Sequence, residues 1–320
     1  MKKIVVAPDS FKGSLTSAEV ADAVERGIKD VFPQCNVVKA GVADGGEGTV
    51  EAIVKAVGGD MYTASVTDPL GRPVKAAYGI VRSGGVKTAV MEMSAASGLP
   101  LLLPDELNPW ITSTYGTGEM ISDALNRGCR KFLIGIGGSA TNDAGTGMLS
   151  ALGVRFLDSR GQRLKGCGRD LESIARINMS SLMPAARESE FIVACDVNTP
   201  FCGPDGAARV FAPQKGADPQ TAEALDRGMR SFARVIAGQF QTDIVPLSGA
   251  GAAGGLGGAF KAFLNARLTA GIEMVLDAIA FDSLLEGADL VITGEGRIDA
   301  QTAAGKTAAG VPVSYTNLRA

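Results

Sequence analysis

Apolar and polar segments alternate along this chain, and their spacing predicts parallel strands joined by helices. Residues 3–7 predict a first buried strand, and apolar residues then recur at helical spacing from Val20 to Val31. Thr16 and Glu19 stand at capping-box spacing, so this helix is expected to begin at Ser14 or Thr16. A second strand over 36–42 and a helix over 49–57 complete a βαβα unit, which implies a parallel sheet.

The pattern changes near Asp60. Residues 61–66 and 74–81 predict antiparallel strands around a proline-glycine turn, and a third strand is expected over 88–93. The strand–loop–helix pattern returns near Ala288. We therefore expect an α/β protein of two domains, with residues 1–60 and 288–320 forming one domain and residues 61–287 inserted as the second.

Several further elements are expected inside the inserted part. Strands are predicted there over 131–136 and 191–194, and helices over 117–126, 146–152 and 219–240; after the inserted part, a last strand is predicted over 288–292. A glycine-rich run over 249–258 opens another helix.

The segment over 135–145, Gly-Ile-Gly-Gly-Ser-Ala-Thr-Asn-Asp-Ala-Gly, predicts a phosphate-binding turn between a strand and a helix. Its glycines let backbone N–H groups crowd around an anion, and the helix N-terminus adds partial positive charge. A tight turn that binds nothing is the alternative for one such cluster alone. Similar loops recur at other strand ends, where they carry Asp9 and Lys12, Asp44 and Glu47, Asp143, Asp196, and Glu295 and Asp299.

Composition narrows the chemistry. The net charge is −3, so nucleic acid is not an expected partner. The chain has no histidine, which excludes Ser-His-Asp and Cys-His catalysis and leaves Asp, Glu, Lys, Tyr or Cys as a general base. Glycine-rich loops beside several carboxylates suit phosphoryl transfer with a hard cation.

Location and redox state follow from two further features. No apolar run is long enough to span a bilayer, and the N-terminus becomes polar too early for a signal peptide. The five cysteines are odd in number and form no Cys-x-x-Cys pair, which favours reduced thiols in the cytoplasm.

Two common nucleotide-binding motifs are not matched. Gly305-Lys306-Thr307 resembles the end of a Walker A motif, but its first glycine would fall at Ala300. The run over 249–258 contains Gly-x-Gly spacings but lacks the acidic residue of a dinucleotide-binding fold. A nicotinamide dehydrogenase is therefore disfavoured.

Taken in order, seven motifs resemble the bacterial glycerate kinase family over residues 1 to about 311. They lie at 7–14 (APDSFKGS), 43–48 (ADGGEG), 137–143 (GGSATND), 196–198 (DVN), 203–208 (GPDGAA), 251–257 (GAAGGLG) and 293–299 (TGEGRID). The resemblance implies a flavodoxin-like domain built from both chain ends, an inserted α/β domain, and transfer of the γ-phosphoryl group of ATP to D-glycerate to give 2-phosphoglycerate. Family members continue past Lys306 with further strands and helices, so a truncated or wrongly joined end is expected here.

On this resemblance, site roles are expected as follows. Asp9, Lys12 and Asp196 are the catalytic candidates, with Asp9 or Asp196 as the base. Carboxylates are expected to hold Mg²⁺, and the candidates are Asp44, Asp143 and Asp196. ATP is expected on the glycine loops and the last strand end, at Gly137, Gly138, Ser139, Thr141, Asn142, Gly254, Gly255, Glu295 and Arg297.

Several of these candidate residues also have other interpretations. Lys12 or Arg297 is expected to bind the glycerate carboxylate. Asp9 and Asp44 also suit turns, Glu295 and Asp299 also suit an ion pair with Arg297, and the run over 249–258 also suits close helix packing. A non-catalytic protein that senses a phosphorylated sugar acid is the alternative function. A homo-oligomer is an open expectation.

Overall fold

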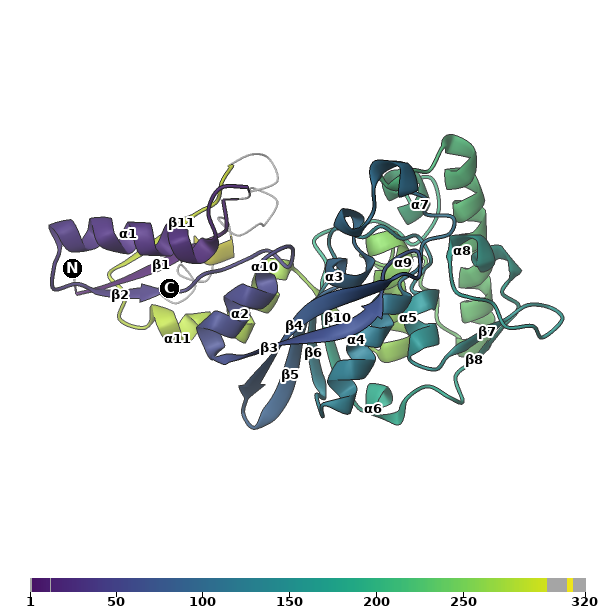
Figure 1. The fold of residues 1–320 in the computed structure, drawn as a ribbon, viewed down its shortest axis with the longest axis horizontal. Coiled ribbons are helices and arrows are strands. Elements are labelled where there is room, and N and C mark those ends of the chain that lie inside the picture. Colours follow the sequence, from purple (N-terminus) through teal and green to yellow (C-terminus); the bar gives the residue numbers. More distant parts are fainter. Residues whose placement is uncertain (1, 12, 298–309, 313–320) are drawn as a thin grey trace.

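The computed structural model describes residues 2–11, 13–297 and 310–312. Its strands form two main sheets, which lie in different parts of an elongated molecule (Figure 1). The small sheet is parallel, with the order β11-β1-β2, and consists of β1 (Lys3–Pro8), β2 (Asn36–Lys39) and β11 (Leu290–Gly294). The first and last described strands therefore lie side by side, as the parallel βαβα opening and the late return of that pattern predicted.

The large sheet has the order β10-β9-β6-β5-β4-β3. Its strands are β3 (Gly59–Thr67), β4 (Pro73–Ser83), β5 (Val86–Glu92), β6 (Lys131–Gly135), β9 (Glu190–Ala194) and β10 (Arg267–Thr269). β5, β6, β9 and β10 are parallel, whereas β3 and β4 are antiparallel to their neighbours. A separate hairpin joins β7 (Arg155–Leu157) to β8 (Arg176–Asn178). The mixed α/β fold class is confirmed.

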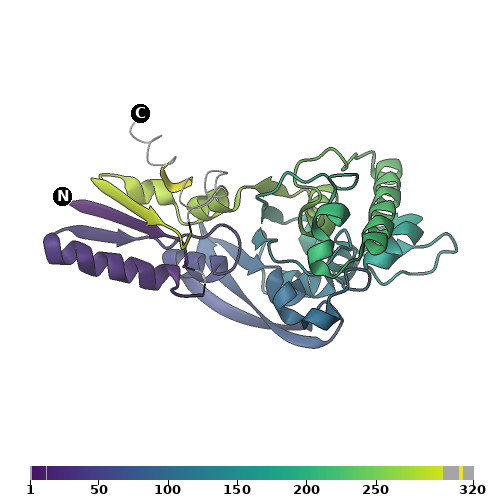
Figure 2. The same cartoon turned by 90° about the horizontal axis from the view of Figure 1, so that it is seen from above.

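Helices cover both faces of each sheet (Figure 2). Around the small sheet lie α1 (Ser17–Val31), α2 (Thr49–Val57), α10 (Gly271–Ala278) and α11 (Phe281–Leu285). The rest are α3 (Ser94–Ser97), α4 (Tyr115–Asn126), α5 (Thr146–Ala151), α6 (Pro184–Arg187), α7 (Ala207–Phe211), α8 (Pro219–Phe240) and α9 (Ala252–Leu264). Thr16 caps α1, and the capping box with Glu19 is present.

Because side chains alternate along a strand, its two faces contribute to different hydrophobic cores. In β1, Val5 and Ala7 join a buried cluster that contains Leu133 and Ile192 of the large sheet, whereas Ile4 faces α1. Both faces of β1 are therefore buried, which explains its continuous apolar run. Because α2, α10 and α11 fill this shared cluster, the two sheets are packed against one layer of helices.

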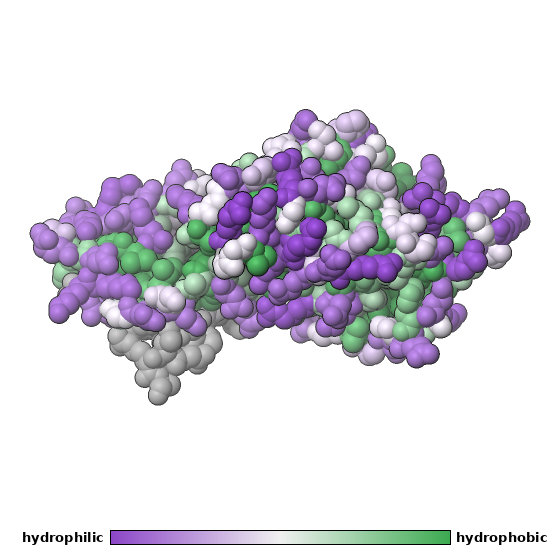
Figure 3. Space-filling view, turned by 90° about the horizontal axis from the view of Figure 1, so that it is seen from below, coloured by the Kyte–Doolittle hydropathy of each residue, from purple (hydrophilic) through white to green (hydrophobic). Residues whose placement is uncertain are grey.

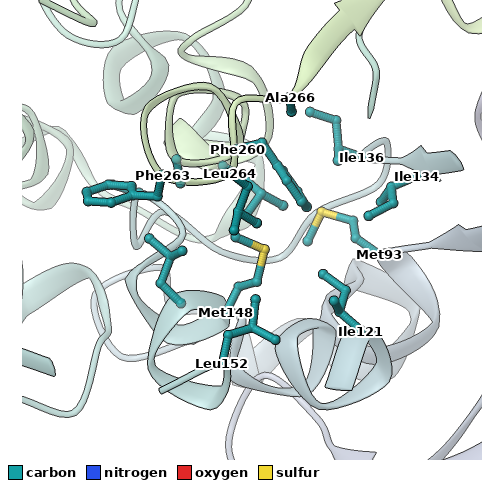
Figure 4. Close-up of a cluster of buried hydrophobic side chains, with 14 of the residues drawn as sticks. Met93, Ile121, Ile134, Ile136, Met148, Leu152, Phe260, Phe263, Leu264 and Ala266 are labelled. Carbon is teal, nitrogen blue, oxygen red and sulfur yellow. The ribbon is translucent and has the colours of Figure 1, made fainter. Parts of the chain in front are cut away.

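The opposite face of the large sheet carries the largest core. Ile134 and Ile136 point toward Met93, Met148 and the aromatic rings of α9 (Figure 4). Hydrophilic side chains cover most of the face in Figure 3, and hydrophobic ones lie between them in both the narrower and the broader part. The division into domains at 60 and 288 stays a prediction, because α10 and α11 contact the cores of both sheets.

Most predicted boundaries differ from the structure by one or two residues, and two differences are larger. The second strand was expected to reach residue 42 but ends at Lys39, although Ala40 and Val42 still donate N–H groups to Val6 and Pro8. The glycine-rich run does open α9, but Ala253, Gly254 and Gly255 have left-handed backbone angles there, so regular helix begins after them.

Candidate functional site

The carboxyl ends of β1 and β11 place two candidate carboxylates side by side. Pro8 pairs with Gly294, and the Asp9 N–H donates to the Gly294 carbonyl at 2.8 Å. Asp9 is buried and its Oδ1 accepts the Ser10 N–H at 2.6 Å. Next to it, Glu295 has a buried Oε1 with no hydrogen-bond partner in the part of the chain that the structure describes.

Asp9 also borders a cavity of about 670 Å³. Its walls come from α1, from the loop after β2 and from α2, and they include Ala43, Glu47 and Gly48. A cavity of this size accommodates a small organic acid or part of a nucleotide. Arg297 is exposed at the end of β11, while Lys12 and Asp299, and the segment 305–307, lie outside the described residues.

The loop between β2 and α2 extends from the small sheet to the large one (Figure 1). Three glycines permit this close approach. A Cβ added to Gly45 would lie 2.5 Å from that of Ala194, one on Gly135 would collide with the Gly45 carbonyl, and one on Gly271 would collide with the Asp44 carbonyl. The loop therefore sits directly on the carboxyl ends of β6 and β9.

Asp44 and Asp196 meet at this junction. Asp196 follows β9, is exposed, and accepts the Gly271 N–H at 2.8 Å, while the Asp44 backbone packs on the same glycine. Asp44 Oδ1 accepts the Gly46 N–H at 3.3 Å. The Asp44 backbone and the Asp196 carboxylate, far apart in sequence, thus both contact Gly271.

The glycine loop after β6 reaches the same junction. An added Cβ on Gly137 would be 4.0 Å from the Gly46 Cα, and both Gly137 and Gly138 are exposed. Within the described residues, no acceptor meets the backbone N–H groups of Gly137, Gly138 and Ser139. Free N–H groups on exposed glycines are what an anion requires.

The remaining loop residues point into the protein. Thr141 and Asn142 are fully buried, and Asn142 Nδ2 donates to the Met229 sulfur at 3.3 Å. Gly254 packs on Thr141 and Asn142, and Gly255 packs on Ala144 and Phe201, so an added Cβ on either would collide with these neighbours or press tightly on them. Close packing, the alternative weighed for the glycine-rich run, explains both glycines without a ligand.

Asp143 accepts hydrogen bonds inside the protein, a structural role that its sequence position did not indicate. It is fully buried, and its oxygens accept the Thr114 N–H and hydroxyl at 2.7 and 2.8 Å and the Gly145 and Gly147 N–H groups at 3.0 and 3.2 Å. Burial raises the pKa of Asp143, while the Thr114 donors oppose that shift. Because its oxygens are engaged inside the protein, Asp143 is not part of the metal site proposed below.

Glu92, at the end of β5, is a residue that the sequence prediction missed. Its Oε1 accepts the Val50 N–H at 3.2 Å, at the start of α2, where Gly48 provides no side-chain cap. Burial raises the pKa of Glu92 to about 7, assisted by the charges of Glu51 and Glu47 and opposed by the Val50 N–H. Its only sequence signal is a lone carboxylate at the end of an apolar strand.

Glu92 predicts a pH dependence of stability. Its folded pKa of about 7 lies above the ordinary value of 4.5, so the folded state keeps a proton that the unfolded chain releases. This contribution is complete below pH 4.5 and is lost as the pH rises to 7, at a cost of about 3 kcal/mol. Glu92→Gln keeps the acceptor without the charge, and is expected to raise the free energy of unfolding at pH 8 but not at pH 4.5.

Urea unfolding at the two pH values measures this difference. Glu188→Gln, at the exposed end of α6, controls for the loss of one surface negative charge without changing the charges that act on Glu92. An equal effect of Glu92→Gln at both pH values would show that Glu92 does not titrate between them.

Neither a cluster of metal-binding side chains nor a membrane-spanning helix is found among the described residues. Among residues 2–11, 13–297 and 310–312, no group of three or more Asp, Glu or Cys side chains is arranged to hold a metal ion. No helix in those ranges is both long and apolar enough to cross a membrane.

Comparison with known proteins places the chain among enzymes of one kind. The sequence model of the Glycerate kinase family matches residues 4–317. A glycerate kinase of Bacillus subtilis (strain 168) is 50% identical over 97% of this chain and 80% of its own length, and the glycerate 2-kinase of Escherichia coli (strain K12) is 47% identical over 99% and 81%. A crystal structure of a protein assigned as glycerate kinase 2, from Salmonella typhimurium LT2, is similar with a TM-score of 0.93 and 46% identity, over 99% of this chain and 84% of that one.

Proposed function

Because the chain belongs to the glycerate kinase family, we propose that it transfers the γ-phosphoryl group of ATP to D-glycerate and forms 2-phosphoglycerate. The contacts at Gly271 are the main observation that supports a site for this reaction. Gly271 contacts the Asp44 backbone and the Asp196 carboxylate, and the exposed glycines after β6 adjoin the same loop, so this junction brings two acidic residues close to exposed backbone N–H groups. Phosphoryl transfer depends mainly on such positioning and charge neutralisation.

The residues at this junction fit magnesium. Mg²⁺ takes one or two carboxylates together with phosphate oxygens and water, and Asp44 and Asp196 supply that number. When bound, the ion neutralises charge on the transferred group. Glycerate is proposed in the cavity beside Asp9, with Lys12 or Arg297 holding its carboxylate and Asp9 accepting the proton of its hydroxyl.

The glycine loop provides the nucleotide side of the proposal. Gly137, Gly138 and Ser139 present N–H groups to the phosphates of ATP, and the buried Glu295 oxygen lies at the end of β11 beside Asp9. Thr141, Asn142, Gly254 and Gly255 support this loop from inside the protein. A cytoplasmic location, which the five unpaired cysteines support, and a homo-oligomeric state stay predictions.

An assay with ATP, MgCl₂ and D-glycerate tests the function. We expect ADP to form only when glycerate is present, and the product to be consumed by enolase without a mutase, because enolase acts directly on 2-phosphoglycerate. Glycerate that raises the melting temperature without any ADP release would instead identify a binding protein. Substitution of L-glycerate is the matched control for the substrate.

A further inference from the structure

Lys215 lies beneath the glycine loop and is one of the few fully buried charged residues among those described. It ends a short 3₁₀ turn, Pro213–Lys215, and only 1% of its surface is exposed. Its Nζ donates to the Ser139 Oγ at 2.7 Å and to the Thr141 carbonyl at 2.6 Å. Both partners belong to the loop after β6.

The charge of Lys215 is only partly offset by its surroundings. Its two acceptors are neutral, and no carboxylate of the described residues forms an ion pair with it. Burial lowers the pKa of Lys215 to about 7, and only the charge of Asp143 opposes that shift. Since a buried ammonium without a counter-charge is costly, an anion on the far side of the loop would stabilise it.

The loop is oriented so that it can receive such an anion. Three of its carbonyls are occupied from the protein side. The Gly138 carbonyl accepts the Leu99 N–H, the Ala140 carbonyl accepts the Thr112 hydroxyl, each at 2.9 Å, and the Thr141 carbonyl accepts Lys215. The N–H groups of Gly137, Gly138 and Ser139 meet no acceptor in the described part of the chain. Carbonyls inward and N–H groups outward make an anion cradle.

We propose that Lys215 is a positioning residue for nucleotide binding: from inside the protein it fixes Ser139 and Thr141, so that the N–H groups of the loop face a phosphate of ATP, and its charge favours that phosphate. This inference rests on the proposed kinase function and adds to it a residue that does not touch the substrate. The proposal predicts that loss of Lys215 weakens the binding of ATP more than that of glycerate, because glycerate is proposed to bind elsewhere, beside Asp9.

Lys215→Met tests the proposal, because methionine fills nearly the same volume without charge or donors. We expect the KM for ATP and the Kd of the non-hydrolysable analogue AMP-PNP to rise by about 10- to 100-fold, with the KM for D-glycerate changed less than about 2-fold. Lys75→Met is the matched control. Lys75 also donates to a serine hydroxyl, that of Ser65, but on the exposed surface of the hairpin between β3 and β4, and its loss is expected to leave both constants unchanged.

Ser139→Ala keeps the assignment testable if Lys215→Met does not fold. It removes one partner of the ammonium while leaving the charge, and is expected to raise the Kd of AMP-PNP several-fold. Unchanged AMP-PNP affinity in a folded Lys215→Met protein, or in Ser139→Ala, overturns the proposal, as does an increase confined to the KM for glycerate. Calorimetric binding of AMP-PNP needs no turnover, so this test can fail while glycerate phosphorylation stands, and it can succeed if glycerate is not the substrate.

Discussion

Asp196→Asn is expected to reduce the turnover number for glycerate phosphorylation by roughly 10²- to 10⁴-fold. Asparagine keeps an oxygen that can accept the Gly271 N–H, so the backbone contact at the junction is preserved. The change removes the negative charge proposed to hold magnesium opposite Asp44. Because the side chain is exposed, the free energy of unfolding is expected to change by less than about 0.5 kcal/mol.

Steady-state kinetics over a range of MgCl₂ concentrations measure this effect, together with urea unfolding. We expect the variant to need more Mg²⁺ for half-maximal rate. Asp243→Asn is the matched control, because Asp243 is also exposed and its Oδ1 also accepts a backbone N–H, from Val245 at 3.0 Å. A normal rate combined with a large loss of stability would make Asp196 a structural residue and contradict its proposed role.

Asp143→Ala is expected to destabilise the protein by about 3–5 kcal/mol. The change leaves the N–H groups of Thr114, Gly145 and Gly147 without their acceptor in a fully buried place. These donors hold the end of the glycine loop to the start of α4 and α5. Loss of the carboxylate therefore affects both stability and the shape of the proposed phosphate site.

Urea unfolding of three variants distinguishes the loss of a buried carboxylate from the loss of an exposed helix cap. Asp218→Ala removes an exposed cap that accepts the Thr221 N–H at 2.7 Å, and is expected to cost about 1 kcal/mol. Asp143→Asn, which retains one acceptor oxygen, is expected to fall between the two alanine variants. If Asp143→Ala costs no more than Asp218→Ala but changes the Mg²⁺ dependence of the rate, Asp143 is a metal ligand after all.

Much of the architecture followed from local patterns. The apolar run over 3–7 predicted β1, and helical spacing with the Thr16–Glu19 capping box placed α1, because these signals depend on residues that are close in sequence. The parallel opening and the antiparallel hairpin after Asp60 were likewise readable from turns and alternation. Glycines at strand ends indicated where the loops of the proposed site lie.

The sequence by itself determined the fold class, the elements and the positions of the glycine and carboxylate loops. Only the tertiary structure decided which of those groups act together. Burial separates Asp143, whose oxygens are used inside the protein, from Asp196, which is exposed beside Asp44. Lys215 carries no local signal and Glu92 only that of a carboxylate at a strand end, since their importance comes from partners more than 70 and 40 residues away. Desolvation and long-range hydrogen bonding depend on all neighbours in space, and a pattern along the chain does not record them.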